Sequence, residues 1–444
     1  MSLRILHISD IHFRDYKDHQ VLNLDNDIQN EINIDLETHV KKHGKIDIIL
    51  LGGDIAFSGQ ESEYKVADTW IKNICKISGC QEEDVFCVPG NHDIDRTQID
   101  PMLKDIHKIF KGLQSRREID YKIGDYLLKP SSTTSLLLPL NSYFQFAEKY
   151  GCVPMAGNNL YWEKDFSLDD IILRIRGVNS ALVSNDTDHQ QTSRLVLGSH
   201  QSSLTRSKGV IHMILCHHPP DWLIDGEDVR KDFKSRARIH LYGHKHSFDV
   251  ELINNECIVL SAGAMQPSRA ESGWEPRYNI IELNTIPMAD KPTLNVRLYK
   301  RVWKKATKTF IPDFEAAGEE YVEYPMVLTD LEISTNIAHK KKGAPETVVG
   351  ELKLAPMVEP LINLNMPDPK RRLAYLFLGL PYHTKVIIAA KLKLIDDSDR
   401  NLPESQKTQL YFKRATEQGI LSTLWDEVSA VSDVGSKNPF IQKS

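Results

Sequence analysis

The sequence predicts an α/β protein in which two β-sheets pack face to face between helices, followed by a small all-α module. Three observations predict this architecture. Strand and helix patterns alternate over residues 3–88, strand patterns dominate residues 171–302, and short helical patterns follow a change of composition near residue 336. A chain of 444 residues is also long enough for two or more domains.

The N-terminal elements follow the order β-α-β-α-β. Apolar runs at residues 3–9, 47–51 and 85–88 predict strands, and residues 24–43 and 63–77 between them carry apolar side chains at helical spacing. Strands joined through helices usually pair in parallel, and the helices then cover both faces of the sheet. We therefore expect a largely parallel sheet in this part of the chain.

Residues 94–165 interrupt this alternation. Helical patterns at residues 99–113 and 136–150 flank a polar turn that is rich in serine and threonine. An insertion that directly follows residues 91–93 could form a helical cap beside that loop. The alternative is a packing subdomain that lies away from it.

Strand patterns resume after the insertion and come close together. Their short connections predict a more antiparallel arrangement than in the first part, and hence a second sheet. The predicted strands are residues 171–178, 210–215, 239–242, 258–261, 278–283 and 294–302.

The C-terminal part begins with a charged, proline-punctuated linker at residues 336–356, which separates it from residues 1–335. A compact helical interaction module is expected at residues 357–435. It pairs no nucleophile with a base, so we expect it to bind rather than to catalyse. Its predicted helices are residues 371–380, 384–394, 405–418 and 420–431, with core residues Leu376, Phe377, Leu421 and Leu424 and candidate contact residues Arg371, Arg372, Lys413 and Arg414.

Composition narrows the class of protein. Hydrophobic residues make up 41% and charged residues 26% of the chain, as in ordinary globular proteins. The net charge of −6 shows no bulk basicity of the kind that advertises nucleic-acid binding. Six cysteines without a Cys-x-x-Cys pair predict buried thiols. No signal-peptide pattern and no apolar run near ~18 residues is present, so we expect a cytoplasmic protein without a membrane span.

Five predicted strands end in polar residues of similar chemistry, and such strand ends are where α/β sheets place their sites. Their side chains offer oxygen and imidazole nitrogen but no thiolate, which suits manganese, iron or zinc better than magnesium. Seven ligands exceed the three of a mononuclear catalytic site but suffice for two metals that share a carboxylate. The candidate ligands are Asp10, His12, Asp54, Asn91, His217, His244 and His246.

The series Asp-x-His, Gly-Gly-Asp, Gly-Asn-His-Asp, His-His-Pro and Gly-His-x-His resembles the calcineurin-like metallophosphoesterases over about residues 1–300. The resemblance implies a two-sheet sandwich with a site for two divalent metal ions, of which manganese is the first choice and iron or zinc the alternatives. It further implies that His92 protonates the leaving oxygen or steadies the transition state, and that Asp93 orients it. Simpler roles are a loop cap for Asp93 and a local hydrogen bond for His218. The implied ligands are Asp10, His12 and His246 for the first metal, Asn91, His217 and His244 for the second, and Asp54 as the bridge.

Two further segments bear on the substrate. Arg96 follows the Asn-His-Asp block closely, as arginines do in phosphoprotein phosphatases of this family. Residues 198–204, which read Gly-x-x-Gln-x-x-Leu in this chain, resemble with one residue fewer the Gly-x-x-x-Gln-x-x-Leu segment of cyclic-nucleotide phosphodiesterase-like members, which favours a diesterase. The C-terminal module resembles death-like adaptor domains of bacterial conflict systems, which recruit an effector through homotypic contact.

These resemblances predict a metal-dependent phosphodiesterase that acts on nucleic acid, a nuclease-type effector that fits anti-phage defence. The alternatives are a cyclic-nucleotide or small-nucleotide phosphodiesterase, a protein phosphatase, and a metal-stabilised scaffold without activity. The expected partners are a nucleic acid or nucleotide substrate and a protein partner, or a second copy, bound through the helical module.

Overall fold

The computed structural model divides the chain into two compact units, Met1–Lys342 and Gly343–Ser444. The predicted linker at residues 336–356 lies outside the described residues. Those residues are 2–16, 26–152, 160–186, 188, 194–267, 275–286, 292–313, 319–329 and 331–333 in the first unit, and 369–370, 373, 376–377, 380, 382–396, 399, 404–432 and 438–440 in the second.

The first sheet has the order β12-β11-β10-β1-β2-β3, with β13 also paired to β11. Its parallel part is the predicted β-α-β-α-β run, in which α1 (Asn26–His43) and α2 (Glu61–Ser78) connect the strands. The strands are β1 (Ser2–Ile8), β2 (Ile48–Leu51), β3 (Val85–Cys87), β10 (Arg277–Ile286), β11 (Thr293–Lys304), β12 (Thr309–Pro312) and β13 (Val322–Val327).

The second sheet has the order β4-β5-β6-β7-β9-β8 and is mixed. Its four central strands β5, β6, β7 and β9 pair in parallel, while the edge strands β4 and β8 pair antiparallel with their neighbours. The pairs β5–β6 and β6–β7 can be parallel because α7 (Ser199–Ser202) and α8 (Gly226–Arg236) lie in their connections. Because β10, β11, β12 and β13 also pair antiparallel, the second half is more antiparallel than the first, as predicted. The strands are β4 (Tyr161–Leu168), β5 (Ile171–Val178), β6 (Val210–Cys216), β7 (Ala237–Tyr242), β8 (Phe248–Ile253) and β9 (Cys257–Ala262).

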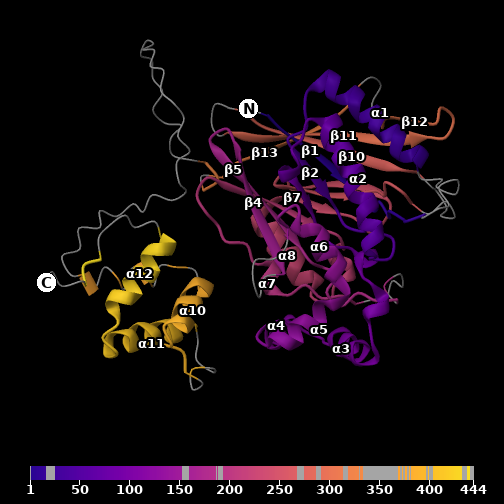
Figure 1. The fold of residues 1–444 in the computed structure, drawn as a ribbon. Coiled ribbons are helices and arrows are strands. Elements are labelled where there is room, and N and C mark those ends of the chain that lie inside the picture. The colour runs from indigo at the N-terminus through magenta and orange to yellow at the C-terminus, as the bar shows by residue number, and fades with distance from the viewer. Residues whose placement is uncertain are drawn as a thin grey trace, which may run out of the picture. The chain divides into compact units, whose positions relative to one another are not determined.

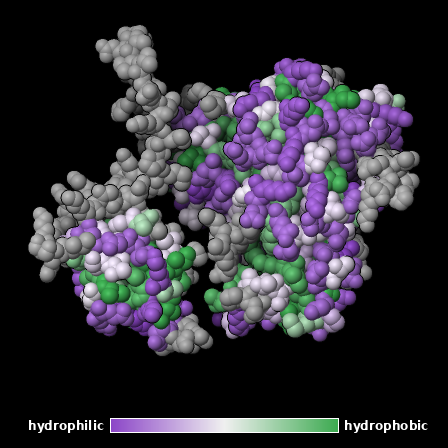
Figure 2. Space-filling view, in the orientation of Figure 1, coloured by the Kyte–Doolittle hydropathy of each residue, from purple (hydrophilic) through white to green (hydrophobic). Residues whose placement is uncertain are grey.

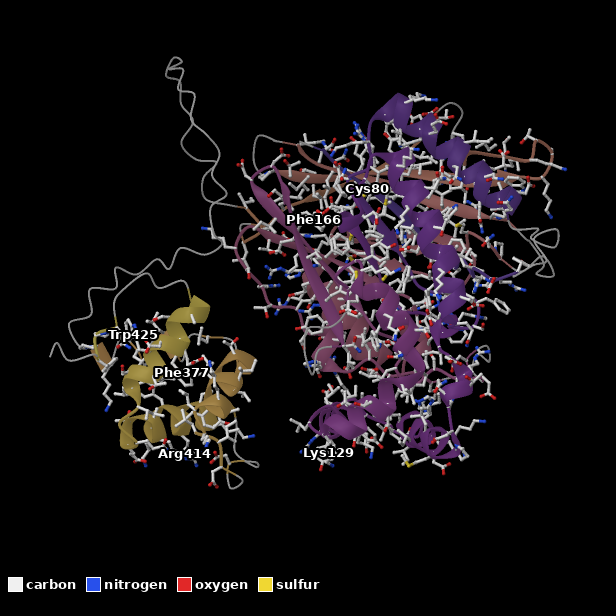
Figure 3. The ribbon with its side chains drawn as sticks, viewed as in Figure 1. Cys80, Lys129, Phe166, Phe377, Arg414 and Trp425 are labelled. Atoms are coloured by element: carbon white, nitrogen blue, oxygen red, sulfur yellow. The ribbon has the colours of Figure 1, made fainter. Side chains whose placement is uncertain are left out.

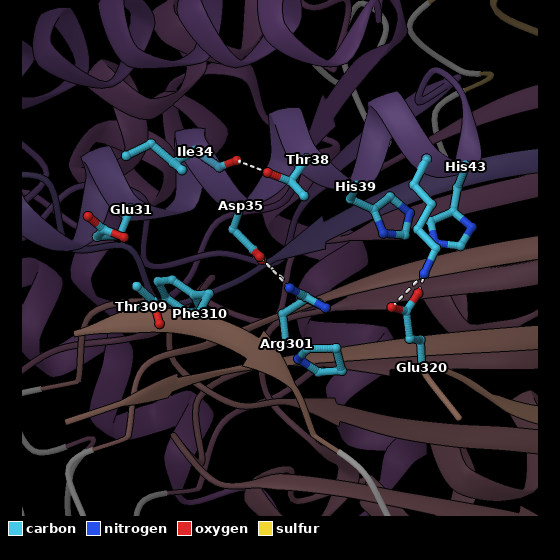
Figure 4. A pocket seen from close by; sticks show the side chains of 12 residues that line it. Glu31, Ile34, Asp35, Thr38, His39, His43, Arg301, Thr309, Phe310 and Glu320 are labelled. Atoms are coloured by element: carbon cyan, nitrogen blue, oxygen red, sulfur yellow. Dashed lines mark hydrogen bonds and ion pairs between the residues drawn. The ribbon is translucent and has the colours of Figure 1, made fainter. Parts of the chain in front are cut away.

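The two sheets share one hydrophobic core, to which both contribute fully buried residues such as Ile5 of β1 and Met213 of β6. Helix α1 is fixed to the first sheet by Asp35, whose carboxylate accepts a 2.8 Å hydrogen bond from Nε of Arg301, as Figure 4 shows. Figure 2 shows mainly hydrophilic residues on the visible surface over α1 and α2, as expected of helices that bury one face. The predicted two-sheet α/β sandwich is confirmed.

The insertion at residues 94–165 is more helical than predicted. Residues 116–137, where a polar turn was expected, form two helices, and Ser115 caps the first of them by accepting a hydrogen bond from the main-chain N–H of Glu118. Figure 1 shows α3, α4 and α5 together at one end of the unit. The four helices are α3 (Pro101–Lys111), α4 (Arg116–Leu127), α5 (Pro130–Leu137) and α6 (Asn141–Glu148).

The second unit is a helical module with its own core. Its helices are α10 (Tyr382–Lys391), α11 (Glu404–Glu417) and α12 (Leu421–Ser432). Phe377 and Leu424 are buried, as predicted, together with Trp425, and Figure 3 labels Phe377 and Trp425 among its side chains. The predicted core residues Leu376 and Leu421 are partly buried against this core.

Arg414 was expected on the contact surface of the module, but it is part of the module's internal structure. Its NH2 group donates a 2.7 Å hydrogen bond to Oδ1 of Asp399, and its NH1 group donates a 2.8 Å bond to the carbonyl of Leu394. Lys413, by contrast, is exposed. Over the described parts of both units, no helix combines the length and apolar character that crossing a membrane requires.

Candidate metal centre

Five loops meet where their strands end. Strands β1, β2 and β3 run parallel in one sheet and β6 and β7 run parallel in the other, so each group presents its carboxyl ends on one edge. Main-chain hydrogen bonds join the loops: the N–H of Asp10 donates to Gly53 (3.0 Å), and that of Gly243 donates to His217 (3.0 Å). The motifs that the sequence singled out therefore occupy one place.

The structure brings the predicted ligands together in overlapping groups. The ligand atoms of Asp10, His12 and His246 all lie within 4.8 Å of one another, as do those of Asp10, Asp54 and His217. Nε2 of His246 is 3.4 Å from Oδ1 of Asp10, and Nε2 of His217 is 3.3 Å from Oδ2 of Asp54. Such spacing is suited to metal coordination, and Asp10 and Asp54 each belong to two of the groups.

Asn91 and His244 complete the set. The side-chain oxygen of Asn91 lies 2.9 Å from Nδ1 of His244 and 3.1 Å from Nε2 of His218. Ser180 accepts a hydrogen bond from the main-chain N–H of His218 and lies 2.8 Å from its Nδ1. His218 therefore does more than bond locally: it links the Asn91 loop to the end of β5. All seven predicted ligands take part in the assembly.

Burial and neighbouring charges set the protonation of these groups. Burial opposes the ionisation of Asp10, but its hydrogen bond to His246 and the nearby His217 outweigh this and lower its pKa to about 2. Burial lowers the pKa of His12 to about 3 and that of His244 to about 4, whereas at His217 the carboxylate of Asp54 outweighs burial and raises the pKa to about 9, so a cation bound there must displace a proton. Ionised carboxylates and neutral imidazoles are the forms that bind a divalent cation. The residues present thus fit a pair of metal ions chemically.

His92 and Asp93 sit next to one another but point to different partners. Nδ1 of His92 lies 2.7 Å from the carbonyl oxygen of Phe57. The carboxylate of Asp93 instead accepts hydrogen bonds from the main-chain N–H groups of Ala56 (2.9 Å) and Gly90 (2.9 Å) and from the Tyr64 hydroxyl (2.9 Å). The prediction that Asp93 orients His92 is therefore wrong, and Asp93 ties the loops after β2 and β3 together.

Backbone strain is concentrated in the ligand loops. Of the ten non-glycine residues with positive φ in the described chain, five are predicted ligands. Residues other than glycine rarely adopt positive φ values, because the Cβ atom then crowds the backbone. The five are Asp10 (54°), His12 (55°), Asp54 (51°), His244 (69°) and His246 (55°).

Glycines of the motifs allow the loops to approach closely. Gly53 has a φ of 95°, and a Cβ atom there would lie 2.5 Å from Nδ1 of His217. A Cβ atom at Gly90 would lie 2.2 Å from Oδ1 of Asp54. Both distances are far below a van der Waals contact, so side chains at these positions would push the ligands apart.

The ligands open onto a cleft of about 630 Å³. Among the described residues that line it there is no arginine, and none comes from the helical insertion. Arg96 is exposed outside this lining. The lining residues are Asp54, Asn91, His92, Asp221, Trp222, His244, Lys245, His246 and Ser247.

The helical insertion contacts the segment at residues 198–204, and this segment in turn contacts the end of β5. Arg116 of the insertion donates a 2.9 Å hydrogen bond to the Ser199 hydroxyl. The side chain of Gln201 is buried and accepts a 2.8 Å bond from the main-chain N–H of Asn179 while donating a 3.0 Å bond to its carbonyl. Gln201 thus supports the end of β5 and does not line the cleft.

Comparison with known proteins agrees with this geometry. The family model "Calcineurin-like phosphoesterase" matches residues 3–248, and the model "GTPase-associated adaptor domain" matches residues 369–430. A curated relative, the uncharacterized metallophosphoesterase-like protein YydB of Bacillus subtilis, is 25% identical over 267 residues, which cover 58% of this chain and 52% of that protein. The chain therefore spans about half the length of this relative.

Similar solved structures include phosphatases. A purple acid phosphatase from yellow lupin (Lupinus luteus) is 13% identical, with a TM-score of 0.37 and coverage of 79% of this chain and 57% of that one. A dimetal phosphatase from Danio rerio is 12% identical, with a TM-score of 0.34 and coverage of 71% and 99%. Scores this low add no argument about the present chain.

The family match spans more than half of the chain and includes all five ligand loops. Members of this family typically bind two divalent metals, and the groups around Asp10 and Asp54 provide candidate ligands for them. The second match confirms the prediction of a C-terminal adaptor module. With its ligand loops and its two-sheet sandwich, the chain belongs to the calcineurin-like phosphoesterase family.

Proposed function

We propose that this chain is a dimetal phosphodiesterase that hydrolyses phosphodiester bonds in nucleic acid. The main support for this proposal is the set of side chains that line the cleft. Carboxylate, amide and imidazole groups surround Asp54, while the described lining contributes one lysine and no arginine. Such a site can hold two cations but offers little extra positive charge, which suits the single negative charge of a diester.

The proposed ligand roles correspond to the groups of neighbouring ligand atoms described above. Asp10, His12 and His246 would hold one metal, Asn91, His217 and His244 would hold the second, and Asp54 would be shared between them. When bound, such a pair of divalent cations would supply an activated water molecule and a Lewis acid for a phosphoryl oxygen. The mixture of carboxylates and imidazoles favours manganese, with iron or zinc as alternatives.

His92 is the proposed proton donor to the leaving oxygen. A carbonyl oxygen accepts but cannot donate, so the contact with Phe57 places a proton on Nδ1 of His92. Nε2 is then the ring atom free to exchange a proton in the cleft that His92 lines. The main-chain N–H of His92 donates a 2.7 Å hydrogen bond to Oδ1 of Asp54, which fixes the imidazole relative to the bridging carboxylate.

A monoester dianion would be held less well. Phosphate dianions are usually gripped by arginine forks, and the cation in the described lining, Lys245, lies 3.4 Å from the carboxylate of Asp221, which offsets its charge. Arg96, whose position suggested a phosphatase, is exposed outside the lining. A diester is therefore preferred over a phosphoprotein substrate.

A cyclic-nucleotide or small-nucleotide phosphodiesterase is the second candidate. The volume of the cleft, about 630 Å³, lies within the range of small-molecule sites, so a single nucleotide would fit. The adaptor module supports the role of an effector that is brought to a partner, or to a second copy, by its helices. Recruitment of this kind fits a defence function in which nuclease activity is directed to an invading nucleic acid.

The test is a substrate panel on purified protein loaded with manganese. The panel contains single-stranded DNA, duplex DNA, RNA, 3′,5′-cyclic nucleotides and phosphopeptides, together with a matched diester and monoester of the same nitrophenol. We expect cleavage of a nucleic acid and faster hydrolysis of the diester. Asp54→Asn protein is the inactive control. A strong preference for the monoester, or for phosphopeptides, would contradict the proposal.

A further inference from the structure

An indole ring lies at the rim of the cleft on the side of His244. Trp222 ends the short helix at Pro220–Trp222 that follows β6, and it lines the cleft in a partly buried position. Its ring centroid is 4.2 Å from that of His244, at an interplanar angle of 84°. The contact with His244 is edge-to-face, so His244 leaves at least one face of the indole uncovered.

A second ring lies beside the other ligands. Phe57, in the loop after β2, has 37% of its surface exposed, although a phenyl ring gains from burial. Its centroid is 5.5 Å from that of His92 and 6.3 Å from that of His12. The Arg14 guanidinium carbon lies 3.6 Å from the centre of this ring, and Arg14 is itself exposed. Arg14 covers one face of the ring, so the guanidinium offers a flat, positively charged surface next to the cleft, whose lining includes neither residue but does include His92.

We propose that Trp222 and the Arg14–Phe57 pair are two nucleobase platforms, so that the cleft selects a diester joining two nucleosides of a single strand. This inference rests on the proposed phosphodiesterase function and names its substrate class. One platform adjoins the group that contains His244, and the other adjoins His12 and His92, so the reacting phosphate lies between them.

The charges beside the rings agree with this substrate. Arg14 stacks on Phe57 and is the cation available beside that ring, whereas Lys245, which lines the cleft together with Trp222, is paired with Asp221. Rings that alternate with cations are how proteins hold unpaired strands, because bases stack on the rings while the cations meet the phosphates. Bases of a duplex are already stacked on each other, and a cyclic mononucleotide has one base. Neither can use both platforms.

The plainest alternative is that both rings only pack against the imidazoles to position them. Two substrates separate these roles: a short single-stranded oligonucleotide, and the same backbone with abasic residues on both sides of the scissile phosphate. Stacking acts on the first alone, whereas positioning of the imidazoles acts on both. The readout is the ratio of kcat/KM for the two substrates, measured for Trp222→Leu, Phe57→Leu and Arg14→Ala proteins.

We expect Trp222→Leu and Phe57→Leu each to lower this ratio roughly 5- to 150-fold, as the loss of one stacked base implies. Phe57→Leu keeps the main-chain carbonyl that meets His92, so its effect reports the ring. Trp222→Phe should restore most of the ratio because it restores a stacking face. Tyr121→Leu, which removes a ring that is 78% exposed on α4, is the matched control and should leave the ratio unchanged.

Three other results would contradict the platforms, the selection for two nucleosides, or the proposed function. An unchanged ratio in both Leu variants that bind their metals overturns the platforms and leaves the diesterase standing. If Trp222→Leu and Phe57→Leu lower kcat/KM for a 3′,5′-cyclic mononucleotide as much as for the oligonucleotide, the selection for two nucleosides is overturned. Wild-type protein that cleaves no diester, with or without bases, refutes the proposed function itself.

Discussion

Nδ1 of His92 lies 2.7 Å from the carbonyl oxygen of Phe57, so a main-chain group of a neighbouring loop orients this imidazole. Asp93, the adjacent carboxylate, instead receives main-chain N–H groups from the loops after β2 and β3. In the proposed function His92 transfers a proton, whereas the contacts of Asp93 hold the loops together. Their substitutions should have different consequences.

His92→Ala protein should keep its metals yet lose roughly 10²- to 10⁴-fold in rate, the usual contribution of one acid–base residue. The loss should be smaller for nitrophenyl esters, whose leaving group needs no proton. Asp93→Asn is the matched comparison: it should lower the melting temperature while keeping the wild-type dependence on the leaving group. Equal losses for His92→Ala on good and poor leaving groups would reduce His92 to an electrostatic role.

Asp54→Asn protein should bind less metal in total and lose turnover, because Asp54 belongs to groups on both sides of the site. His246→Ala should mainly deplete one site, since His246 groups with Asp10 and His12. Elemental analysis of the purified proteins measures both effects. Two full equivalents of metal in active Asp54→Asn protein would contradict the bridging role.

The free energy of unfolding should fall as the pH drops below 6.5, in part because of His240. Burial lowers the pKa of His240 from 6.5 to about 4, so the folded chain keeps this imidazole neutral where the unfolded chain protonates it. The unfolded state therefore takes up more protons, and the stability present above pH 6.5 is lost between pH 6.5 and about 4. The loss is about 3 kcal/mol for a shift of this size.

His240→Gln should flatten that acid decline, because glutamine keeps a hydrogen-bond donor but does not titrate. Denaturant unfolding at pH 7.5 and pH 5 measures the difference for both proteins. His200→Gln, at an exposed position of α7, serves as the control and should retain the wild-type decline. An equally steep decline in His240→Gln protein would assign the effect to other groups.

A chain truncated after Lys342 should hydrolyse a diester reporter at nearly the wild-type rate, because no group of candidate ligands in the described chain includes a residue of the adaptor module. Association with a partner or a second copy, measured by sedimentation, should be lost. Lys413→Glu is the suitable charge reversal because Lys413 is exposed. Arg414→Glu is not, because it would break the pair with Asp399. Loss of metal from the truncated chain would make the module part of the catalytic fold.

The sequence predicts the ligand loops well because each motif is local and follows an apolar strand. It predicts less where the pattern is sparse. Helix α8 buries only Val229 and Phe233 among its apolar residues, so its helical signal is faint. Without that helix, the sequence does not show that β6 and β7 pair in parallel. The sequence could not predict that the Phe57 carbonyl contacts His92, because every residue carries a main-chain oxygen and no residue type marks this one.

The left-handed backbone at five of the predicted ligands has a consequence for the history of such chains. A non-glycine residue there costs about 1 kcal/mol in conformational energy, which glycine would not incur. Glycine at His12 or His244 would remove that cost, but it would also remove an imidazole that packs against the ring of Phe57 or Trp222. The two effects on stability oppose each other, whereas the effect on metal binding is a loss in either case. Glycine at these positions in a related chain would therefore indicate that its metal site has been lost, and not that its fold has been improved.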